Sequence, residues 1–265
     1  MKIISYNVNG LRSIIKKESF IDFIKSSNAD IIILQETKIN GDIEIPHTEK
    51  YPFQYFSHSL VKKGHAGVCM LSKYEPCKVT FEMKSDFDNE GRLLIAEFYK
   101  FTLINVYVPN SGQATLKTFP NRMKWDINFK KYIKSKLEID SSRSSGRDEP
   151  LIIMGDFNTI LSELDYWKST KENLLKLPRF AGLTVEERDN LHSILDLGLT
   201  DTFRKLHPNT RKYTYVNYLA KDRSKGWRID FALVNNKYLK KVINSDILTE
   251  VIGSDHFPII LNIKL

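Results

Sequence analysis

The chain has 265 residues, 42% of them apolar and 27% charged, which suffices to bury the core of one large domain. Forty Lys and Arg against 32 Asp and Glu give a formal charge of +8, which suits a polyanionic partner. The chain has only two cysteines, Cys69 and Cys77, which argues against a disulfide framework and indicates a reducing, intracellular setting. Because no apolar run approaches the roughly 18 to 20 residues of a membrane span, we expect an unsecreted protein of the cytoplasm or nucleus, with one domain over residues 1–265.

Short β-favouring runs and amphipathic helical segments alternate along the chain, as in an α/β protein. The run at 30–36 holds four consecutive apolar residues, which is typical of a central strand covered on both faces. Thr184 and Glu187 form a capping box at the start of a helix that ends at Gly198. The pattern predicts strands at residues 2–8, 30–36, 66–71, 79–81, 92–99, 102–108, 151–156, 213–216, 228–234 and 258–263, and helices at 14–24, 125–137 and 184–195.

Two segments between these elements have unusual compositions. Residues 141–148 are rich in Ser and Arg and are expected to form a surface loop. Residues 159–183 are irregular and mix basic with aromatic side chains. There is also a loose internal echo between Ile31-Ile-Ile-Leu-Gln-Glu36 and Leu151-Ile-Ile-Met-Gly-Asp156, which suits two similar half-sheets packed face to face.

Polar side chains follow several of the apolar strands directly. Asn7, Glu36 and Asp156 each end a strand, and Gly253-Ser-Asp-His256 precedes the last apolar run. A carboxylate at a strand end stands on a rigid scaffold yet meets solvent, which suits a metal ligand or a group that orients water. Taken singly, each is better explained as a turn residue, a surface acid or a partly buried histidine. Their shared position favours a site, and their oxygen atoms suit a hard cation such as Mg²⁺ or Mn²⁺ rather than structural zinc.

Short motifs extend these polar positions into an ordered series along nearly the whole chain. They are Ser5-Tyr-Asn-Val-Asn-Gly-Leu-Arg12, Leu34-Gln-Glu-Thr-Lys38, Gly64-His-Ala-Gly-Val68, Glu90-Gly-Arg92, Asn105-Val-Tyr-Val-Pro-Asn110, Gly155-Asp-Phe-Asn158, Ala181-Gly-Leu-Thr184 with Glu187-Arg188, Gly226-Trp-Arg-Ile-Asp230 and Gly253-Ser-Asp-His-Phe-Pro258. With this series the chain resembles the exonuclease III family of apurinic/apyrimidinic (AP) endonucleases, within the endonuclease/exonuclease/phosphatase superfamily that includes DNase I. Any one motif alone would be a weak signal, whereas the ordered set is specific.

The resemblance implies a four-layer α/β sandwich, in which two mixed β-sheets pack face to face with helices on both outer sides. It implies that Glu36 is the principal ligand of Mg²⁺, which Mn²⁺ can replace, with Asn9 and Asp255 nearby as further ligands. Some members of the family carry Asp where Asn9 stands, and some carry Arg where Gln113 stands.

The resemblance also assigns roles in catalysis and substrate binding. Asp156 would orient or deprotonate the attacking water, while Asn7 and Asn158 hold the scissile phosphate. His256 would contact the same phosphate, with its ring fixed by Asp230. The remaining assignments are Tyr107 against the phosphate or the leaving oxygen, Arg12, Lys38 and His65 in substrate binding, and Tyr215, Trp227 and Ile229 as the walls of a small apolar pocket, the last two on one face of one strand.

The implied function is that of a DNA repair nuclease in base excision repair. It would hydrolyse the phosphodiester 5′ to an abasic site in duplex DNA, act on blocked 3′ ends with 3′-phosphodiesterase and 3′–5′ exonuclease activity, and work as a monomer. Two alternatives stay open. One is another phosphoesterase of the same superfold, acting on a lipid headgroup, an inositol phosphate or an RNA tail, against which the Gly226-Trp-Arg-Ile-Asp230 segment argues. The other is a catalytically dead DNA-binding module, disfavoured because every proposed catalytic residue type is present.

Overall fold

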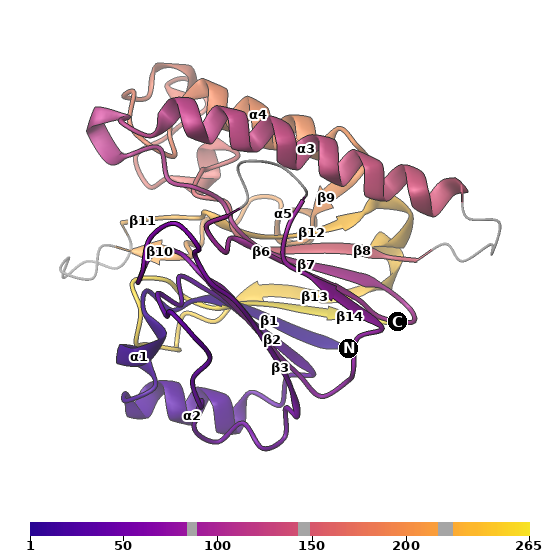
Figure 1. Cartoon of the computed structure of the whole chain (residues 1–265). Helices are drawn as coiled ribbons and strands as arrows, with labels where there is room; N and C mark the ends of the chain where they lie inside the picture. The colour runs from indigo at the N-terminus through magenta and orange to yellow at the C-terminus, as the bar shows by residue number, and fades with distance from the viewer. Residues whose placement is uncertain (84–88, 143–148, 217–224) are drawn as a thin grey trace.

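Two mixed β-sheets packed face to face form the centre of the molecule, with helices on both outer sides (Figure 1). The computed structural model describes residues 1–83, 89–142, 149–216 and 225–265. Within these residues each sheet has six strands, in the orders β13-β14-β1-β2-β4-β3 and β5-β6-β7-β8-β12-β9. In Figure 1 the helices α1 and α2 lie outside the first sheet, and α3 and α4 lie outside the second. The predicted four-layer α/β sandwich is therefore confirmed.

The elements have the following bounds. The first sheet contains β1 Lys2–Asn7, β2 Ile31–Gln35, β3 Phe53–Ser57, β4 Val68–Ser72, β13 Val242–Ile247 and β14 Ile259–Ile263. The second contains β5 Lys78–Thr80, β6 Leu93–Glu97, β7 Thr102–Tyr107, β8 Leu151–Asp156, β9 Leu199–Asp201 and β12 Asp230–Asn235, and a separate ribbon pairs β10 Tyr215–Val216 with β11 Gly226–Trp227. The helices are α1 Leu11–Ile14, α2 Glu18–Ser26, α3 Phe119–Ser142, α4 Val185–Leu195 and α5 Thr202–Leu206, with 3-10 turns η1 Gln113–Thr115, η2 Glu163–Asp165, η3 Leu174–Lys176 and η4 Asn236–Lys241.

The internal echo in the sequence corresponds to a repeated arrangement of strands. Each sheet is built on one parallel pair, β1 with β2 and β7 with β8. An antiparallel strand flanks each member of both pairs. The two echoing segments are thus β2 in one sheet and β8 in the other, as the half-sheet prediction required.

The uninterrupted apolar run of β2 follows from burial on both of its faces. Side chains alternate along a strand, so Ile31 and Ile33 join the core between the two sheets while Ile32 and Leu34 pack toward the outer helices. On the second sheet, Trp125, Phe129 and Ile133 of α3 bury the other outer face. Rigid strands, covered on both sides, therefore end together at the rim where the polar residues stand.

Several predicted boundaries were wrong. The first predicted helix is two helices, because the backbone of Lys17 is extended (φ −89°, ψ 130°) between α1 and α2. The strand predicted at 213–216 begins at Tyr215, and the one predicted at 228–234 begins at Asp230. Strands β3, β9 and β13 were not predicted; all three are edge strands, and β3 and β13 are only partly buried, so their apolar patterns are weak. The short β11 was also missed.

The remaining expectations concern caps, cysteines and loops. The Thr184 capping box is present at the start of α4. Cys69 is buried, Cys77 is exposed, and both are free thiols. The predicted loop at 141–148 begins instead with the last residues of α3, and from 143 onward it lies outside the described residues. Along the described chain, no helix is long and apolar enough to cross a membrane.

Candidate active site

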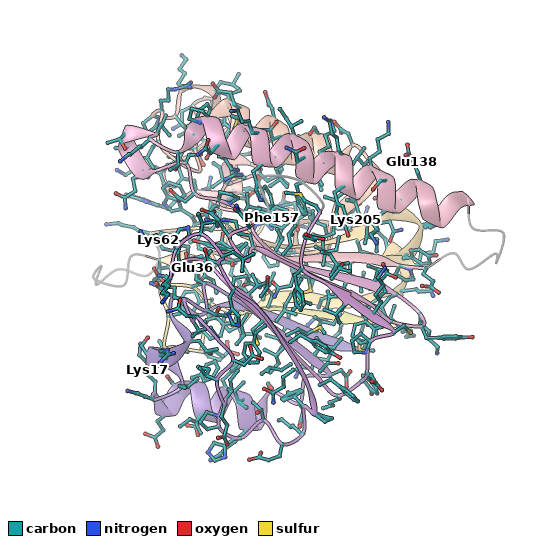
Figure 2. All side chains as sticks on the ribbon, in the orientation of Figure 1. Lys17, Glu36, Lys62, Glu138, Phe157 and Lys205 are labelled. Atoms are coloured by element: carbon teal, nitrogen blue, oxygen red, sulfur yellow. The ribbon has the colours of Figure 1, made fainter. Side chains whose placement is uncertain are left out.

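The polar strand ends meet at one rim of the sandwich. Asn7 ends β1, Tyr107 ends β7, and Asp156 ends β8 between its register partners Tyr107 and Asp230. The Asn7 amide donates to Asp156 Oδ2 at 2.9 Å and so connects the two sheets. Figure 2 shows Glu36 on the opposite side of the view from the two chain termini, which Figure 1 marks in the same orientation.

Asp156 is the carboxylate at the centre of this cluster. It is 1% exposed, and its Oδ1 accepts a hydrogen bond from the backbone N–H of Asn158 at 2.8 Å. Burial and the adjacent Asp230 carboxylate raise the pKa of Asp156 to about 8, against the opposing effect of His256. A carboxyl group whose pKa lies near neutrality is well matched to taking a proton from water.

His256 and Asp230 form a buried pair beside Asp156. The imidazole Nδ1 lies 2.8 Å from Asp230 Oδ2, and Nε2 lies 3.9 Å from Asp156 Oδ2. Burial disfavours the imidazolium, but the carboxylates of Asp230, Asp156 and Asp255 outweigh it and raise the pKa of His256 to about 10. Asp230 therefore fixes the ring and keeps it positively charged, which suits contact with a phosphate.

Glu36 has a different environment. Its carboxylate accepts a hydrogen bond from the Tyr107 hydroxyl and lies 2.8 Å from Lys38 Nζ. Burial raises the pKa of Glu36, but Lys38 and Tyr107 outweigh it, so the pKa is lowered and the group stays ionised. Burial and the Glu36 carboxylate raise the pKa of Tyr107 well above its usual value, so the phenol stays protonated and acts as a donor.

The three residues predicted as metal ligands are linked to one another around the Lys38 ammonium group. The Lys38 ammonium contacts both the Glu36 carboxylate and Asn9 Oδ1, and the Asn9 amide donates to Asp255 Oδ1 at 3.0 Å. Two carboxylates and an amide oxygen are the donor types that a hard divalent cation prefers. The predicted set therefore fits a metal ion chemically, with Lys38 as the cation that neutralises it here.

A second cluster brings acidic and imidazole ligand atoms together, although the positively charged form of His256 would have to lose a proton before it could bind a metal. Among the described residues, Asp156, Asp230 and His256 bring one ligand atom each within 4.8 Å of one another. This group was predicted for catalysis rather than for metal binding. The protein thus carries an acidic and histidine cluster beside the predicted ligand set, and the choice of Glu36 as the principal ligand stays a prediction.

One cavity of about 540 Å³ is lined by some of the predicted catalytic and metal-binding residues and by all three predicted pocket walls. The polar members of this set are Glu36, Asn158, Asp255 and His256. The other lining residues are Asn110, Gln113, Trp167, Phe180, Ala181, Tyr215, Lys225, Trp227 and Ile229. Acidic, imidazole and apolar side chains therefore line the same space, whereas Asn7, Tyr107, Asp156 and Asp230 are not among the residues that line it.

The prediction that Trp227 and Ile229 share one strand was wrong, although both residues line the cavity. Trp227 belongs to β11, whose partner is Tyr215 of β10, and Ile229 lies between β11 and β12. The two side chains reach one face because Arg228 between them turns inward, where it pairs with Asp165 at 2.7 Å. The two residues belong to different elements that meet at the cavity.

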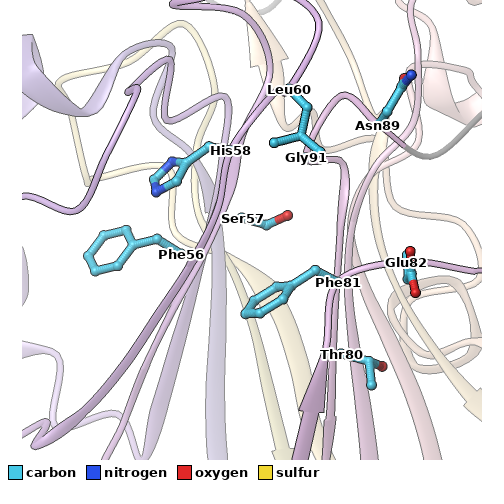
Figure 3. Close-up of a pocket in the computed structure, with 9 residues that line it drawn as sticks. All are labelled: Phe56, Ser57, His58, Leu60, Thr80, Phe81, Glu82, Asn89 and Gly91. Carbon is cyan, nitrogen blue, oxygen red and sulfur yellow. The ribbon is translucent and has the colours of Figure 1, made fainter.

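The other predicted substrate contacts lie around this cavity rather than in it. Arg12 is exposed on α1. His65 lies 3.2 Å from the Arg92 guanidinium and lines a neighbouring cavity of about 580 Å³ with Arg92, Tyr107 and Gln113. A third cavity of about 420 Å³, between Phe56 and Phe81, contains none of the predicted site residues (Figure 3).

Sequence reasoning missed several residues at the site. Arg92 was quoted as part of a motif but given no role, yet its guanidinium lies 4.8 Å from the centre of the Tyr107 ring and donates to the Tyr107 carbonyl. Trp167, Phe180 and Lys225 line the cavity of about 540 Å³, but the sequence analysis did not assign them to it. The mixture of basic and aromatic residues at 159–183 was the signal that pointed to Trp167 and Phe180.

Comparison with known proteins decides the family. Residues 4–256 match the profile of the Endonuclease/Exonuclease/phosphatase family. The chain belongs to this family. It is 37% identical to the DNA repair nuclease APEX1 of Danio rerio over 268 residues, covering 98% of this chain and 81% of that protein. It is 35% identical to an exodeoxyribonuclease of Bacillus subtilis over 270 residues, covering 100% of both.

A solved structure extends the family assignment to the fold. An AP endonuclease from Archaeoglobus fulgidus superposes with a TM-score of 0.81 at 26% identity, covering 100% of both chains. The predicted resemblance, the sandwich fold and the expectation of a hydrolytic nuclease active in DNA repair are therefore confirmed for this endonuclease/exonuclease/phosphatase family member.

Proposed function

We propose that this nuclease hydrolyses the phosphodiester 5′ to an abasic site in duplex DNA, and processes blocked 3′ ends, with Mg²⁺ as its cofactor. The observation that carries the proposal is the shared cavity, in which Glu36, Asp255 and His256 face Tyr215, Trp227 and Ile229. An acidic and imidazole wall suits phosphodiester hydrolysis. An apolar wall suits a sugar that has lost its base.

The buried cluster supplies the groups that such a hydrolysis needs. Asp156 in its ionised form takes a proton from the attacking water, since a raised pKa of about 8 makes this carboxylate a stronger base than an ordinary aspartate. The His256 imidazolium, held by Asp230, offsets the negative charge that develops on the phosphate. Water adds to phosphorus, the bond to the 3′ oxygen breaks, and the products are a 3′-hydroxyl end and a 5′-phosphate on the abasic residue.

The remaining polar residues position the phosphate and the leaving oxygen. The Asn158 amide donates to the Val108 carbonyl and its Oδ1 accepts from Asn110, which orients the side chain at the cavity. Tyr107, which its raised pKa keeps protonated, would donate to the departing 3′ oxygen in place of its hydrogen bond to Glu36. Glu36, Asn9 and Asp255 would hold Mg²⁺, which when bound polarises the phosphate and shields its charge.

The apolar walls explain how an abasic site would be selected. Rotating an intact nucleotide out of the duplex costs a few kcal/mol, and a nucleotide without a base costs less. Tyr215, Trp227 and Ile229 then receive the exposed sugar, and Ile229 is itself buried. The net positive charge of the chain aids its approach to DNA whether or not the DNA carries an abasic site.

The test is cleavage of an end-labelled duplex that carries one tetrahydrofuran abasic analogue, with Mg²⁺ and with a chelator, beside an undamaged duplex. We expect one cut 5′ of the analogue that needs the metal. Asp156→Asn should abolish it, whereas Asp22→Asn, at an exposed position on α2, should not. Turnover of inositol phosphates or lipid headgroups without cleavage of either duplex would overturn the proposal in favour of another phosphoesterase.

A further inference from the structure

A second cavity lies beside the catalytic one, and the proposed reaction gives it no occupant. It has a volume of about 580 Å³ and lies between the segment before β6, the end of β7, the loop that contains η1 and the first turns of α3. We call it the Trp125 cavity, after the residue of α3 that lines it together with Lys117 and Asn121. Asn110 and Gln113 line both this cavity and the one of about 540 Å³. A substrate bound in the catalytic cavity therefore has this second space directly at its side.

Trp125 gives this cavity a buried hydrogen-bond donor. The residue is 2% exposed and packs against Phe129, with 4.8 Å between the ring centroids. Its indole N–H is buried and has no hydrogen-bond partner among the described residues. A buried donor without a partner is destabilising, and the large majority of buried polar groups in native proteins are paired. The Trp125 N–H is therefore free to donate to an acceptor atom of a ligand in the cavity.

The charges around Trp125 favour a neutral ligand over a small anion. The Arg92 guanidinium is 5% exposed and is already paired with Glu90, at 2.6 Å. Burial and the positive charge of Arg92 lower the pKa of His65, so its ring is neutral near neutral pH. Lys117, by contrast, is exposed. The interior of the cavity thus suits a neutral group with hydrogen-bonding edges, and Lys117 suits a phosphate attached to that group.

A nucleobase has these properties. It is neutral and flat, it carries donors and acceptors along its edges, and side-chain amides such as those of Gln113 and Asn121 pair with such edges. The volume of about 580 Å³ lies within the range of about 300 to 1,000 Å³ that is usual for small-molecule sites. In a duplex with an abasic site, the base opposite the lesion has no partner, and an unpaired base costs least to rotate out of the helix. That base is therefore the one most readily brought to the cavity.

We propose that the Trp125 cavity receives the unpaired base opposite the abasic site, with the Trp125 N–H as a donor to its edge. The abasic sugar enters the catalytic cavity and the opposite base enters its neighbour, so that Asn110 and Gln113 stand between the two nucleotides. Guanine and thymine present carbonyl oxygens where adenine and cytosine present amino groups. A donor at this position thus favours guanine over adenine and thymine over cytosine. The inference rests on the proposed function, because it concerns a second feature of the same substrate.

The first test measures kcat/KM of the wild-type protein for incision at a tetrahydrofuran in five duplexes, with only the incised strand labelled. The opposite position carries guanine, adenine, thymine, cytosine or a second tetrahydrofuran. We expect kcat/KM to be about tenfold higher opposite guanine than opposite the second tetrahydrofuran, the effect of one buried hydrogen bond. Guanine should also exceed adenine, and thymine should exceed cytosine. Equal values for all five duplexes would overturn the subsite alone, whereas no incision of any duplex would refute the proposed function.

The second test removes the donor. Trp125→Phe keeps a ring and loses the N–H, so the ratio of kcat/KM opposite guanine to that opposite adenine should fall to about one. Phe129→Leu is the matched control and should keep the wild-type ratio, because Phe129 is buried beside Trp125 on α3 and does not line the cavity. An unchanged ratio in folded Trp125→Phe, or an equal loss on all five duplexes, would overturn the subsite, and the second outcome would indicate a backbone phosphate as the occupant. If circular dichroism shows that Trp125→Phe does not fold, the wild-type comparison of the five duplexes decides by itself.

Discussion

Replacing Arg228 with Met tests how the wall of the cavity is supported. The Arg228 guanidinium is 1% exposed and contacts Asp165 Oδ1 and Asp201 Oδ2, each at 2.7 Å. It also lies 4.4 Å from the centre of the Phe231 ring. Met preserves much of the side-chain volume and removes the charge. Arg228→Met therefore leaves two buried carboxylates, of which Asp165 still contacts the Arg204 guanidinium.

The contacts that Asp165 and Asp201 keep in Arg228→Met decide how much of the free energy of unfolding is lost. Removing one partner of a buried ion pair costs about 3 to 5 kcal/mol, because the other charge is left uncompensated. Asp165 keeps Arg204 at 2.8 Å and the backbone N–H of Ser162 at 2.8 Å. Among the described residues, Asp201 keeps a side-chain hydrogen bond from the backbone N–H of Arg204, at 3.2 Å. We therefore expect a loss near the lower end, about 3 kcal/mol of the free energy of unfolding, which at about 2 °C per kcal/mol for a chain of this size lowers the melting temperature by roughly 6 °C.

Urea unfolding of the wild type, Arg228→Met and the double variant Asp201→Asn/Arg228→Met measures this cost. The double variant should be more stable than Arg228→Met, because Asp201→Asn removes the negative charge that Arg228→Met leaves without its cation. Acid sensitivity gives an independent readout. Burial raises the pKa of Asp165, but Arg228 and Arg204 outweigh it, so the pKa is lowered and the stabilisation is lost as the pH falls through that lowered value. Arg228→Met should therefore begin to unfold at a higher pH, and a loss below about 1 kcal/mol would refute the reasoning.

The other predictions concern the reaction itself. Glu36→Gln should keep the fold, raise the Mg²⁺ concentration needed for half-maximal rate and lower turnover by orders of magnitude; near-normal rates at low Mg²⁺ in a metal titration would contradict the ligand assignment. Asp156→Asn should abolish turnover while an abasic duplex still binds, as measured by fluorescence anisotropy, and a parallel loss of binding would make Asp156 structural. The logarithm of DNA affinity should fall linearly with the logarithm of salt concentration, by about 0.9 per phosphate neutralised, and a flat response would argue for a small-molecule substrate.

The strand-end positions of Glu36 and Asp156 could be predicted because local pattern places them. Glu36 and Asp156 each follow an apolar run that both faces of a sheet must bury, and the end of such a strand is a fixed point of the fold. The contact between Asn7 and Asp156 joins residues 149 positions apart in the chain. No periodicity predicts that contact, but the family resemblance supplied it by assigning both residues to one site.

The aromatic wall that Trp167 and Phe180 form in the cavity of about 540 Å³ could not be predicted in the same way. Both residues lie in a segment of short 3-10 turns, where no regular period relates sequence position to side-chain direction. Their position depends on packing against Trp227 from the far end of the chain. Composition indicated only that the segment is basic and aromatic, which fits an exposed loop as well as a cavity wall.

Arg228 explains why Trp227 and Ile229 both line the cavity although they do not share the strand predicted for them. A charged residue between two apolar ones is ordinarily assigned to solvent, whereas here the guanidinium is buried between Asp165 and Asp201. Its backbone N–H also donates to the Asp165 carbonyl at 2.7 Å, so the chain is held on its inward side at this residue. The flanking side chains must then face the other way, toward the cavity. The alternation that a strand would have supplied is imposed instead by the two buried ion pairs of Arg228, and these pairs therefore support two of the proposed pocket walls, Trp227 and Ile229.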